Sequence, residues 1–197
     1  MKTQKYKLSF TAASLSISES VNIAEVYLKC RDWNETKSIV RENNLLQSRT
    51  NSRTTRVLAE IIPRLILLSD DQLSLLVEGS LSEQKYLLWF TICKTYSLIK
   101  EFAVEVLHEK FLSRNMKVTD LDYDAFFNRK ADWNEGLAKI TTLTRKKIRQ
   151  VVFHMMREAD LLTDDNTILR AMLSIRLTNV LKTDAPMSFE IFPVDPY

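Results

Sequence analysis

Apolar residues recur every three to four positions along most of the chain, which is the spacing of one face of an α-helix. The clearest example is the stretch 144–162, in which Ile148, Val152 and Met155 fall on one face. In the first third of the chain, helices are predicted over 11–29, over 32–42 and from 52 to a kink or an end near Pro63. In the middle, helices are predicted to start at 70 and at 81, and the block 83–112 is predicted to contain two helices that meet near 94–97. In the last third, helices are predicted over 119–127, from 132, over 144–162 and over 166–181. The pattern therefore predicts a mainly α-helical, multi-helix fold.

Short polar motifs mark the starts of several predicted helices. Ser69 with Gln72, and Ser80 with Glu83, have the form of a capping box, in which each side chain bonds the backbone N–H of the other residue. The stretch 32–35, Asp-Trp-Asn-Glu, is an Asp-x-x-Glu variant of the same motif. β-Structure is expected only near the termini. The alternating stretch 5–10 predicts a short strand, and 188–192 an edge strand or wing.

The tetrapeptide Asp-Trp-Asn-Glu occurs at 32–35 and again at 132–135. Each copy precedes a short helix, a turn and a longer helix that begins with basic residues. This is the order of a helix-turn-helix, in which the second helix presents its first residues to the major groove. Chance recurrence is the alternative, because helical hairpins resemble one another. We predict two helix-turn-helix-like or winged-helix-like units, 1–69 and 116–197, around a central apolar helical core at 70–115.

The longer helix of each predicted unit starts with basic and hydroxyl side chains. Positive charge at a helix N-terminus costs about 0.3 kcal/mol or more per group, so we expect a compensating partner outside the helix. A phosphate backbone is the natural candidate, and a solvated basic end on a core helix is the alternative. The candidate DNA-binding residues are Arg49, Thr50, Ser52, Arg53, Arg56, Thr144, Arg145, Lys146, Lys147 and Arg149.

Composition narrows the classes of function. Two glycines in 197 residues exclude a glycine-rich phosphate loop. A net charge of +3 means that any nucleic-acid surface must come from local clusters of basic residues. Cys30 and Cys93 are isolated, as expected of reduced core thiols. The chain has no signal-peptide pattern and no run of the roughly 18–20 apolar residues that span a bilayer. We therefore expect a cytoplasmic protein without a membrane partner.

Candidate catalytic and metal-binding groups are few. Glu105 and His108 have the spacing of two metal ligands on a helix, but no second such pair exists. Asp120, Asp122 and Asp124 fit the acidic first turns of a helix better than a calcium loop. We predict that the protein is not an enzyme and uses no cofactor, metal ion or small-molecule substrate.

Five segments together resemble the BrxA family, the small A component of BREX bacteriophage-resistance systems. The segments are KLSFTAASLSISESVNIAEVYL, NNLLQSRT, EGSLSEQKYLLWFTICKTYSLIKEFAVEVL, YDAFFNRKADWNE and TRKKIRQVVFHMMREADLL. The resemblance implies a cytoplasmic, helical, non-catalytic protein with winged-helix or helix-turn-helix elements that binds double-stranded DNA. It also implies a place beside other BREX components such as the methyltransferase and the ATPase.

Three functions follow as hypotheses. The leading one is a double-stranded DNA-binding accessory protein of a BREX system. The second is a protein-interaction adaptor within the same defence complex. The third is RNA binding, because the family is also similar to the helical fold of transcription antitermination factors.

Overall fold

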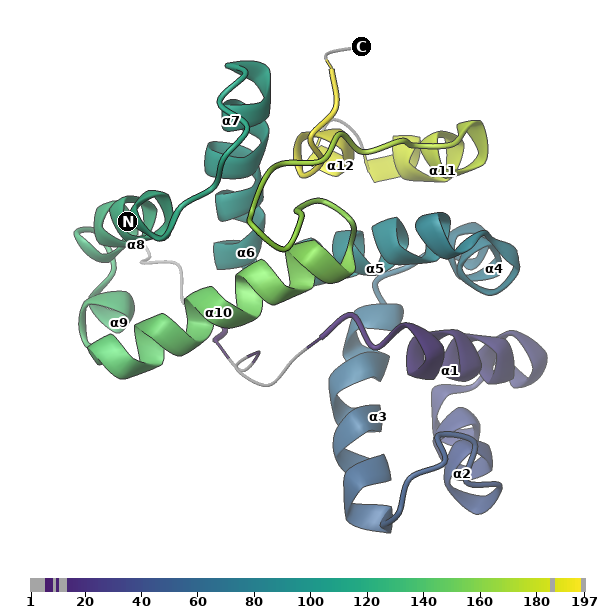
Figure 1. Ribbon diagram of the computed structural model, residues 1–197. Helices are drawn as coiled ribbons and strands as arrows, with labels where there is room; N and C mark the ends of the chain where they lie inside the picture. The colour runs from purple at the N-terminus through teal and green to yellow at the C-terminus, as the bar shows by residue number, and fades with distance from the viewer. Residues whose placement is uncertain (1–5, 9, 11–13, 185–186, 196–197) are drawn as a thin grey trace.

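The structure is a computed structural model that describes residues 6–8, 10, 14–184 and 187–195. It is mainly helical, as predicted, and within those ranges β-structure is confined to two isolated bridges, Lys117–Thr167 and Leu162–Ile168. The helices shown in Figure 1 are α1 (Ile17–Cys30), α2 (Trp33–Glu42), α3 (Asn51–Leu65), α4 (Asp70–Glu78), α5 (Leu81–Thr95), α6 (Ser97–Phe102), the π-helical η1 (Ala103–His108), α7 (Glu109–Leu112), α8 (Asp120–Ala131), α9 (Glu135–Ala138), α10 (Thr142–Glu158), α11 (Ile175–Leu181), the 3₁₀ turn η2 (Lys182–Asp184) and α12 (Met187–Glu190).

Helices α1, α2 and α3 form a three-helix group at the lower right of Figure 1. Asp32 caps α2 by accepting hydrogen bonds from the backbone N–H groups of Asn34 at 2.8 Å and Glu35 at 2.7 Å. Thr50 caps α3 by accepting one from the N–H of Arg53 at 3.3 Å. The predicted short helix, turn and longer helix are therefore present in the first unit.

Helix α5 is the centre of the protein. Every residue from 86 to 93 is buried, and α5 contacts α1, α3, α4, α6 and α10. Trp89 is fully buried and donates its indole N–H to the carbonyl of Ile191 at 3.0 Å. This confirms that the apolar block is core. The predicted break is also correct, because α5 ends at Thr95 and α6 begins at Ser97.

On the other side of α5, helices α8, α9 and α10 form a further group, which is followed by a short hairpin. The hairpin joins 161–163 to 167–169, with the N–H of Leu169 bonded to the carbonyl of Leu161 at 2.9 Å. A third extended segment lies beside it, because the N–H of Ile168 bonds the carbonyl of Met116 at 2.7 Å. Helix α10 thus lies between the helices α8 and α9 at its N-terminal end and the hairpin 161–169 at its C-terminal end (Figure 1). The buried side chains of all three groups form one continuous cluster. The domain boundaries remain a prediction.

The structure changes two expectations about helices in the first unit. The helix predicted from 11 begins at Ile17, because Ser16 has a φ of 52°, in the left-handed region, and cannot continue a right-handed helix. The proposed cap, Thr11, lies outside the described residues. Of the two alternatives for Pro63, an end of the helix near Ile62 is excluded, because α3 continues to Leu65, and a kink stays a prediction. The proline is exposed and its neighbours Ile62 and Arg64 are buried, so their packing outweighs the lost hydrogen bond.

The C-terminal predictions were less accurate. Only Ile175–Leu181 of the predicted helix 166–181 is helical. The preceding residues are extended because their backbone groups bond to other segments, for example Ala171 N–H to the Pro193 carbonyl at 2.9 Å. The stretch 188–192 forms no strand, because Met187–Glu190 is helix α12. Residues 6–8 are not a strand either, and the rest of 5–10 is described only at Phe10.

Candidate nucleic-acid interface

The candidate residues fall into two clusters, and the first, Arg49, Thr50, Ser52, Arg53 and Arg56, lies at the start of α3. The side chains of Arg49, Arg53 and Arg56 are all exposed and form no ion pair within the described chain. Ser52 is exposed beside them. The hydroxyl oxygen of Thr50 already accepts the helix-capping bond from Arg53, so Thr50 has a structural role as well. The start of α3 is therefore a positively charged surface whose three guanidinium groups remain available to a ligand.

The second predicted cluster divides into two pairs of residues. Arg145 and Arg149 point from α10 toward α8, and their side chains are only 22% and 15% exposed. Lys146 and Lys147 are exposed and form no ion pair in the part of the chain that the structure describes. Thr144 is exposed, and its N–H bonds the hydroxyl of the capping residue Thr141 at 3.2 Å.

The carboxylates of α8 hold Arg145 and Arg149. Arg145 lies 3.0 Å from a carboxylate oxygen of Asp124, donates to the side-chain oxygen of Asn128 at 2.7 Å and stacks over the ring of Phe127. Arg149 pairs with Asp120 at 2.7 Å and with Asp124 at 3.2 Å. The positive charge at this helix start is therefore compensated within the protein. The expected compensating partner outside the helix is therefore present for these two arginines, but it is α8 and not a phosphate backbone.

Helix α8 is itself anchored, so it forms a firm support for α10. Thr119 and Asp122 form a reciprocal capping box at its start. Burial alone would raise the pKa of Asp122, but hydrogen bonds from Lys110 and Thr119 outweigh it and lower that pKa. Burial raises the pKa of Tyr123 well above its usual range, and its hydroxyl has no hydrogen-bond partner in the described structure. Tyr123 is therefore a neutral core residue.

Sequence reasoning missed part of the exposed face of α10. Leu143 is 80% exposed and Gln150 is also exposed, and both lie on the side that carries Lys146 and Lys147. The signal was present in the sequence. These positions follow the spacing i, i+3, i+4, i+7 on the side of the helix opposite Ile148.

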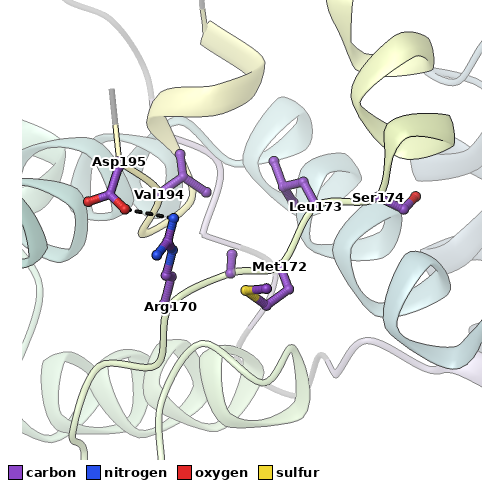
Figure 2. A pocket seen from close by; sticks show the side chains of 7 residues that line it. Arg170, Met172, Leu173, Ser174, Val194 and Asp195 are labelled. Atoms are coloured by element: carbon purple, nitrogen blue, oxygen red, sulfur yellow. Dashed lines mark ion pairs between the residues drawn. The ribbon is translucent and has the colours of Figure 1, made fainter. Parts of the chain in front are cut away.

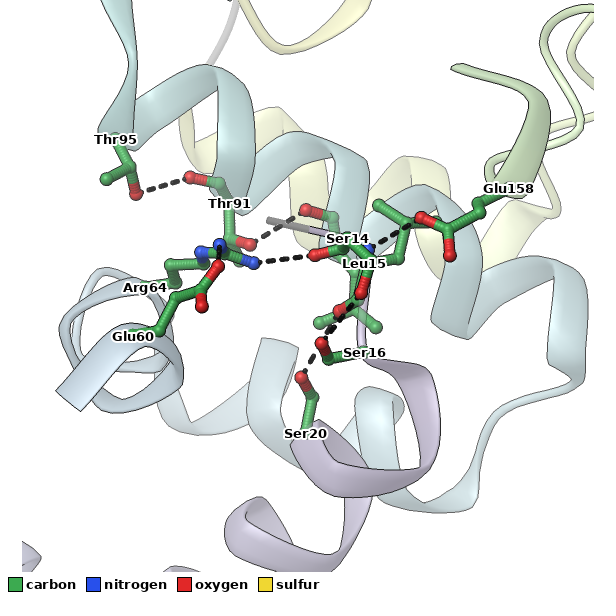
Figure 3. A network of polar contacts seen from close by, with 10 residues as sticks. Ser14, Leu15, Ser16, Ser20, Glu60, Arg64, Thr91, Thr95 and Glu158 are labelled. Atoms are coloured by element: carbon green, nitrogen blue, oxygen red, sulfur yellow. Dashed lines mark hydrogen bonds and ion pairs between the residues drawn. The ribbon is translucent and has the colours of Figure 1, made fainter. Parts of the chain in front are cut away.

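A single segment of the chain holds the C-terminal ends of both candidate helices (Figure 3). At the end of α3, Arg64 donates to the carbonyl of Ser14 at 2.9 Å and pairs with Glu60 at 2.5 Å. At the end of α10, Glu158 accepts from the N–H of Leu15 at 2.9 Å. The guanidinium of Arg64 is 3% exposed and lies over the ring of Tyr96. This segment therefore links the two helices away from their basic starts.

The two Asp-Trp-Asn-Glu copies have different roles. Asp32 caps α2, whereas Asp132 lies at the end of α8 and Asn134 caps α9, accepting from the N–H of Leu137 at 3.1 Å. Trp33 stacks on a neighbouring ring, whereas Trp133 is 87% exposed. The predicted short helix is present at the second copy, but it begins at Glu135 with Asn134 as its cap and not at Asp132. The tetrapeptide alone does not establish a structural repeat.

A pocket of about 530 Å³ lies between the extended segment 170–174 and residues 194–195 (Figure 2). Arg170 and Asp195 form an ion pair of 2.7 Å across it, and Met172 lies at its edge. A second pocket of about 420 Å³ lies between α8, α9 and α10, with Arg145 and Lys146 in its lining. Neither pocket contains a histidine or a cysteine in its lining.

The candidate metal ligands are occupied by other contacts. His108 lies 2.7 Å from the carbonyl of Phe192, and Glu105 pairs with Arg129 and Lys130. Among the described residues, no group of three His, Cys, Asp or Glu side chains has the arrangement to hold a metal ion. No helix within the described ranges combines the length and apolar character needed to cross a membrane.

Comparisons with known proteins place this chain in a family. The family model for BrxA matches residues 4–185. A curated relative from Bacillus cereus (strain H3081.97), named BREX protein BrxA, is 28% identical over 178 residues, which cover 89% of each chain. The crystal structure of an uncharacterized protein from Magnetospirillum magneticum has the same fold, with a TM-score of 0.80 at 17% identity over 96% of this chain and 100% of that one. The chain belongs to the BrxA family.

Proposed function

We propose that this protein is a non-catalytic component of a BREX phage-defence system that binds double-stranded DNA through the starts of α3 and α10. The observation that carries the proposal is that five cations at the two helix starts are exposed and form no ion pair in the described structure: Arg49, Arg53, Arg56, Lys146 and Lys147. The BrxA family match and the relative named as a BREX protein support the defence role.

Two further features favour a duplex as the ligand. In the first unit, α2 and α3 have the order of a helix-turn-helix, with the three arginines at the start of the second helix. In the second unit, a short extended segment at 116–118, helices α8 to α10 and the hairpin 161–169 follow one another as in a winged helix. The hairpin carries Asp164 and Asp165, whose charge disfavours contact with phosphates. We therefore assign the contact to α10 and not to the hairpin.

Arg145 and Arg149 are left out of the proposed phosphate contacts. Using them would require breaking their ion pairs with Asp120 and Asp124. Each phosphate contact contributes about −0.9 to the slope of log affinity against log salt concentration. Five contacts therefore predict a slope of about −4.5, and the predicted slope lies near −2.7 when only the α3 arginines take part.

The test is duplex binding across a salt series with three charge variants. Arg49→Ala/Arg53→Ala/Arg56→Ala and Lys146→Ala/Lys147→Ala should each weaken binding on every sequence and flatten the slope. Arg170→Ala/Arg176→Ala is the matched control, because it removes two exposed charges on the α11 side of the molecule. The control should bind as the wild type does. Absence of duplex binding by the wild type at low salt would refute the proposal. Tighter binding to RNA than to duplex DNA in direct competition would identify RNA as the ligand.

The adaptor hypothesis is favoured by one observation, the 87% exposed side chain of Trp133 between α8 and α9. Exposed tryptophans are over-represented among residues that anchor protein interfaces. Under this hypothesis Trp133→Ala would abolish co-purification with another BREX component while duplex binding stays unchanged. If instead Trp133→Ala leaves co-purification intact, Trp133 is not the anchor.

A further inference from the structure

Four side chains line the free face of α10: Leu143, Lys146, Lys147 and Gln150. All four are exposed, and the structure shows no ion pair or side-chain hydrogen bond for Lys146, Lys147 or Gln150 in the described residues. Because residues three, four and seven apart share a helix face, the four form one continuous strip. The strip carries two cations and no acid.

The composition of the strip differs from what phosphate binding alone requires. Two lysines suffice for phosphate contacts, but an 80% exposed leucine adds nothing to binding an anion. The amide of Gln150 presents a donor and an acceptor in one plane, which matches N7 and N6 of adenine in the major groove. An aliphatic side chain such as Leu143 fits the methyl group of thymine in the same groove.

The ion pairs of α10 explain why this strip faces outward. Arg145 and Arg149 bind Asp120 and Asp124 of α8, and this fixes the rotation of α10 about its axis. The strip lies on the side of α10 opposite the buried Ile148, with Lys146 at the edge nearest α8 and α9. Helix α10 begins next to α9 at the edge of the molecule (Figure 1), where a groove of DNA can receive it.

We infer that α10 reads base edges, with Gln150 contacting an adenine and Leu143 a thymine methyl group, while Lys146 and Lys147 hold the duplex. Seven residues of helix span about 10 Å, or roughly three base pairs at 3.4 Å each. The preferred sites should therefore carry two A·T pairs about three base pairs apart. This inference rests on the proposed DNA binding and adds sequence preference to it.

The experiment is selection of duplexes from a random pool by the full-length protein, with Gln150→Ala and Leu143→Ala in parallel. The wild type should enrich A·T pairs at two positions about three base pairs apart. Gln150→Ala should lose the preference for adenine at its position by about 5- to 150-fold, and Leu143→Ala, with its shorter side chain, should weaken the preference for thymine at the other. Replacing the selected adenine by 7-deazaadenine should weaken wild-type binding and leave Gln150→Ala unaffected. Gln84→Ala on α5 is the control and should enrich the same sequences as the wild type.

Two negative outcomes would lead to different conclusions. If the wild type binds duplexes but enriches no sequence, or if both variants enrich the wild-type sequences, the base-reading inference is wrong and the DNA-binding proposal stands. If no duplex binds at low salt, the DNA-binding proposal fails and the inference fails with it.

Discussion

The guanidinium of Arg149 lies 3.2 Å from the carboxylate of Asp124, so that a charge pair across two helices holds α10 against α8. Asp124 also binds Arg145 at 3.0 Å, and Arg149 also binds Asp120 at 2.7 Å. The residues that look most like a DNA-binding cluster in the sequence thus include two that stabilise the fold. Their neighbours Lys146 and Lys147 form no ion pair among the described residues and remain free for a ligand.

Asp124→Asn tests the stabilising role of this network. The substitution keeps the shape of the side chain but removes the charge that both arginines share, so we expect it to destabilise the protein by about 1–3 kcal/mol. Urea unfolding followed by circular dichroism measures the change. Asp164→Asn is the control, because Asp164 is exposed and has no ion pair in the described chain, and its effect should stay within about 0.5 kcal/mol. Equal effects of the two substitutions would contradict this role.

The different roles of the two tetrapeptide copies predict different stabilities for four single-residue variants. Asp32→Ala and Asn134→Ala each remove a helix cap and should each cost about 1 kcal/mol. Asn34→Ala and Asp132→Ala replace the equivalent residue of the other copy and should each stay within about 0.5 kcal/mol. Thermal or urea unfolding measures all four. Similar losses for Asp32→Ala and Asp132→Ala would mean that the copies are structurally equivalent after all.

The buried pair of Arg64 and Glu60 predicts a stability effect that depends on which partner is removed. Glu60→Gln leaves the 3% exposed guanidinium without its counter-charge, and we expect a loss of about 3 kcal/mol or more. The double variant Arg64→Met/Glu60→Leu should lose less than Glu60→Gln, because no buried charge remains. Glu25→Gln, in the exposed pair with Lys29, is the control, with an expected cost of at most about 0.5 kcal/mol. A double variant less stable than Glu60→Gln would contradict the prediction.

The hydrogen bonds of the Glu83 carboxylate predict that the protein loses stability in acid. The hydroxyl of Ser174 donates to its carboxylate at 2.5 Å and the N–H of Ser80 at 2.7 Å, and these bonds lower the pKa of Glu83 from its ordinary value of 4.5. The folded state therefore binds this proton less readily than the unfolded chain does. The stabilisation is complete above pH 4.5 and is lost as the pH falls through the lowered pKa.

Urea unfolding of the wild type and Glu83→Gln between pH 7 and pH 3 measures this contribution. The difference in the free energy of unfolding between the two proteins should be constant near neutral pH and shrink below pH 4.5. Ser174→Ala should reduce the difference, because it removes the largest cause of the lowered pKa. A difference that does not change with pH would show that the charge of Glu83 is not what stabilises the protein.

Local sequence patterns determined the class of the fold and the starts of most helices. Ser69 and Ser80 cap α4 and α5 as predicted, because a capping bond joins residues only three positions apart and is visible in the sequence. The apolar face of α10 and the buried block in α5 followed from helical spacing for the same reason. The BrxA resemblance was also correct, because it depends on the order of segments along the chain.

The tertiary structure alone decided which charges are free. Asp120 and Asp124 fit a helix start, and nothing in their spacing shows that they bind Arg149 and Arg145, some 20 to 30 residues later. Residues 167–174 follow a helical pattern but are not helical, because the carbonyls of Met116 and Pro193 accept hydrogen bonds from Ile168 and Ala171. In both cases the partner is distant in the sequence, so the choice between a free cation and a paired one, or between helix and extended chain, depends on packing that local patterns do not contain.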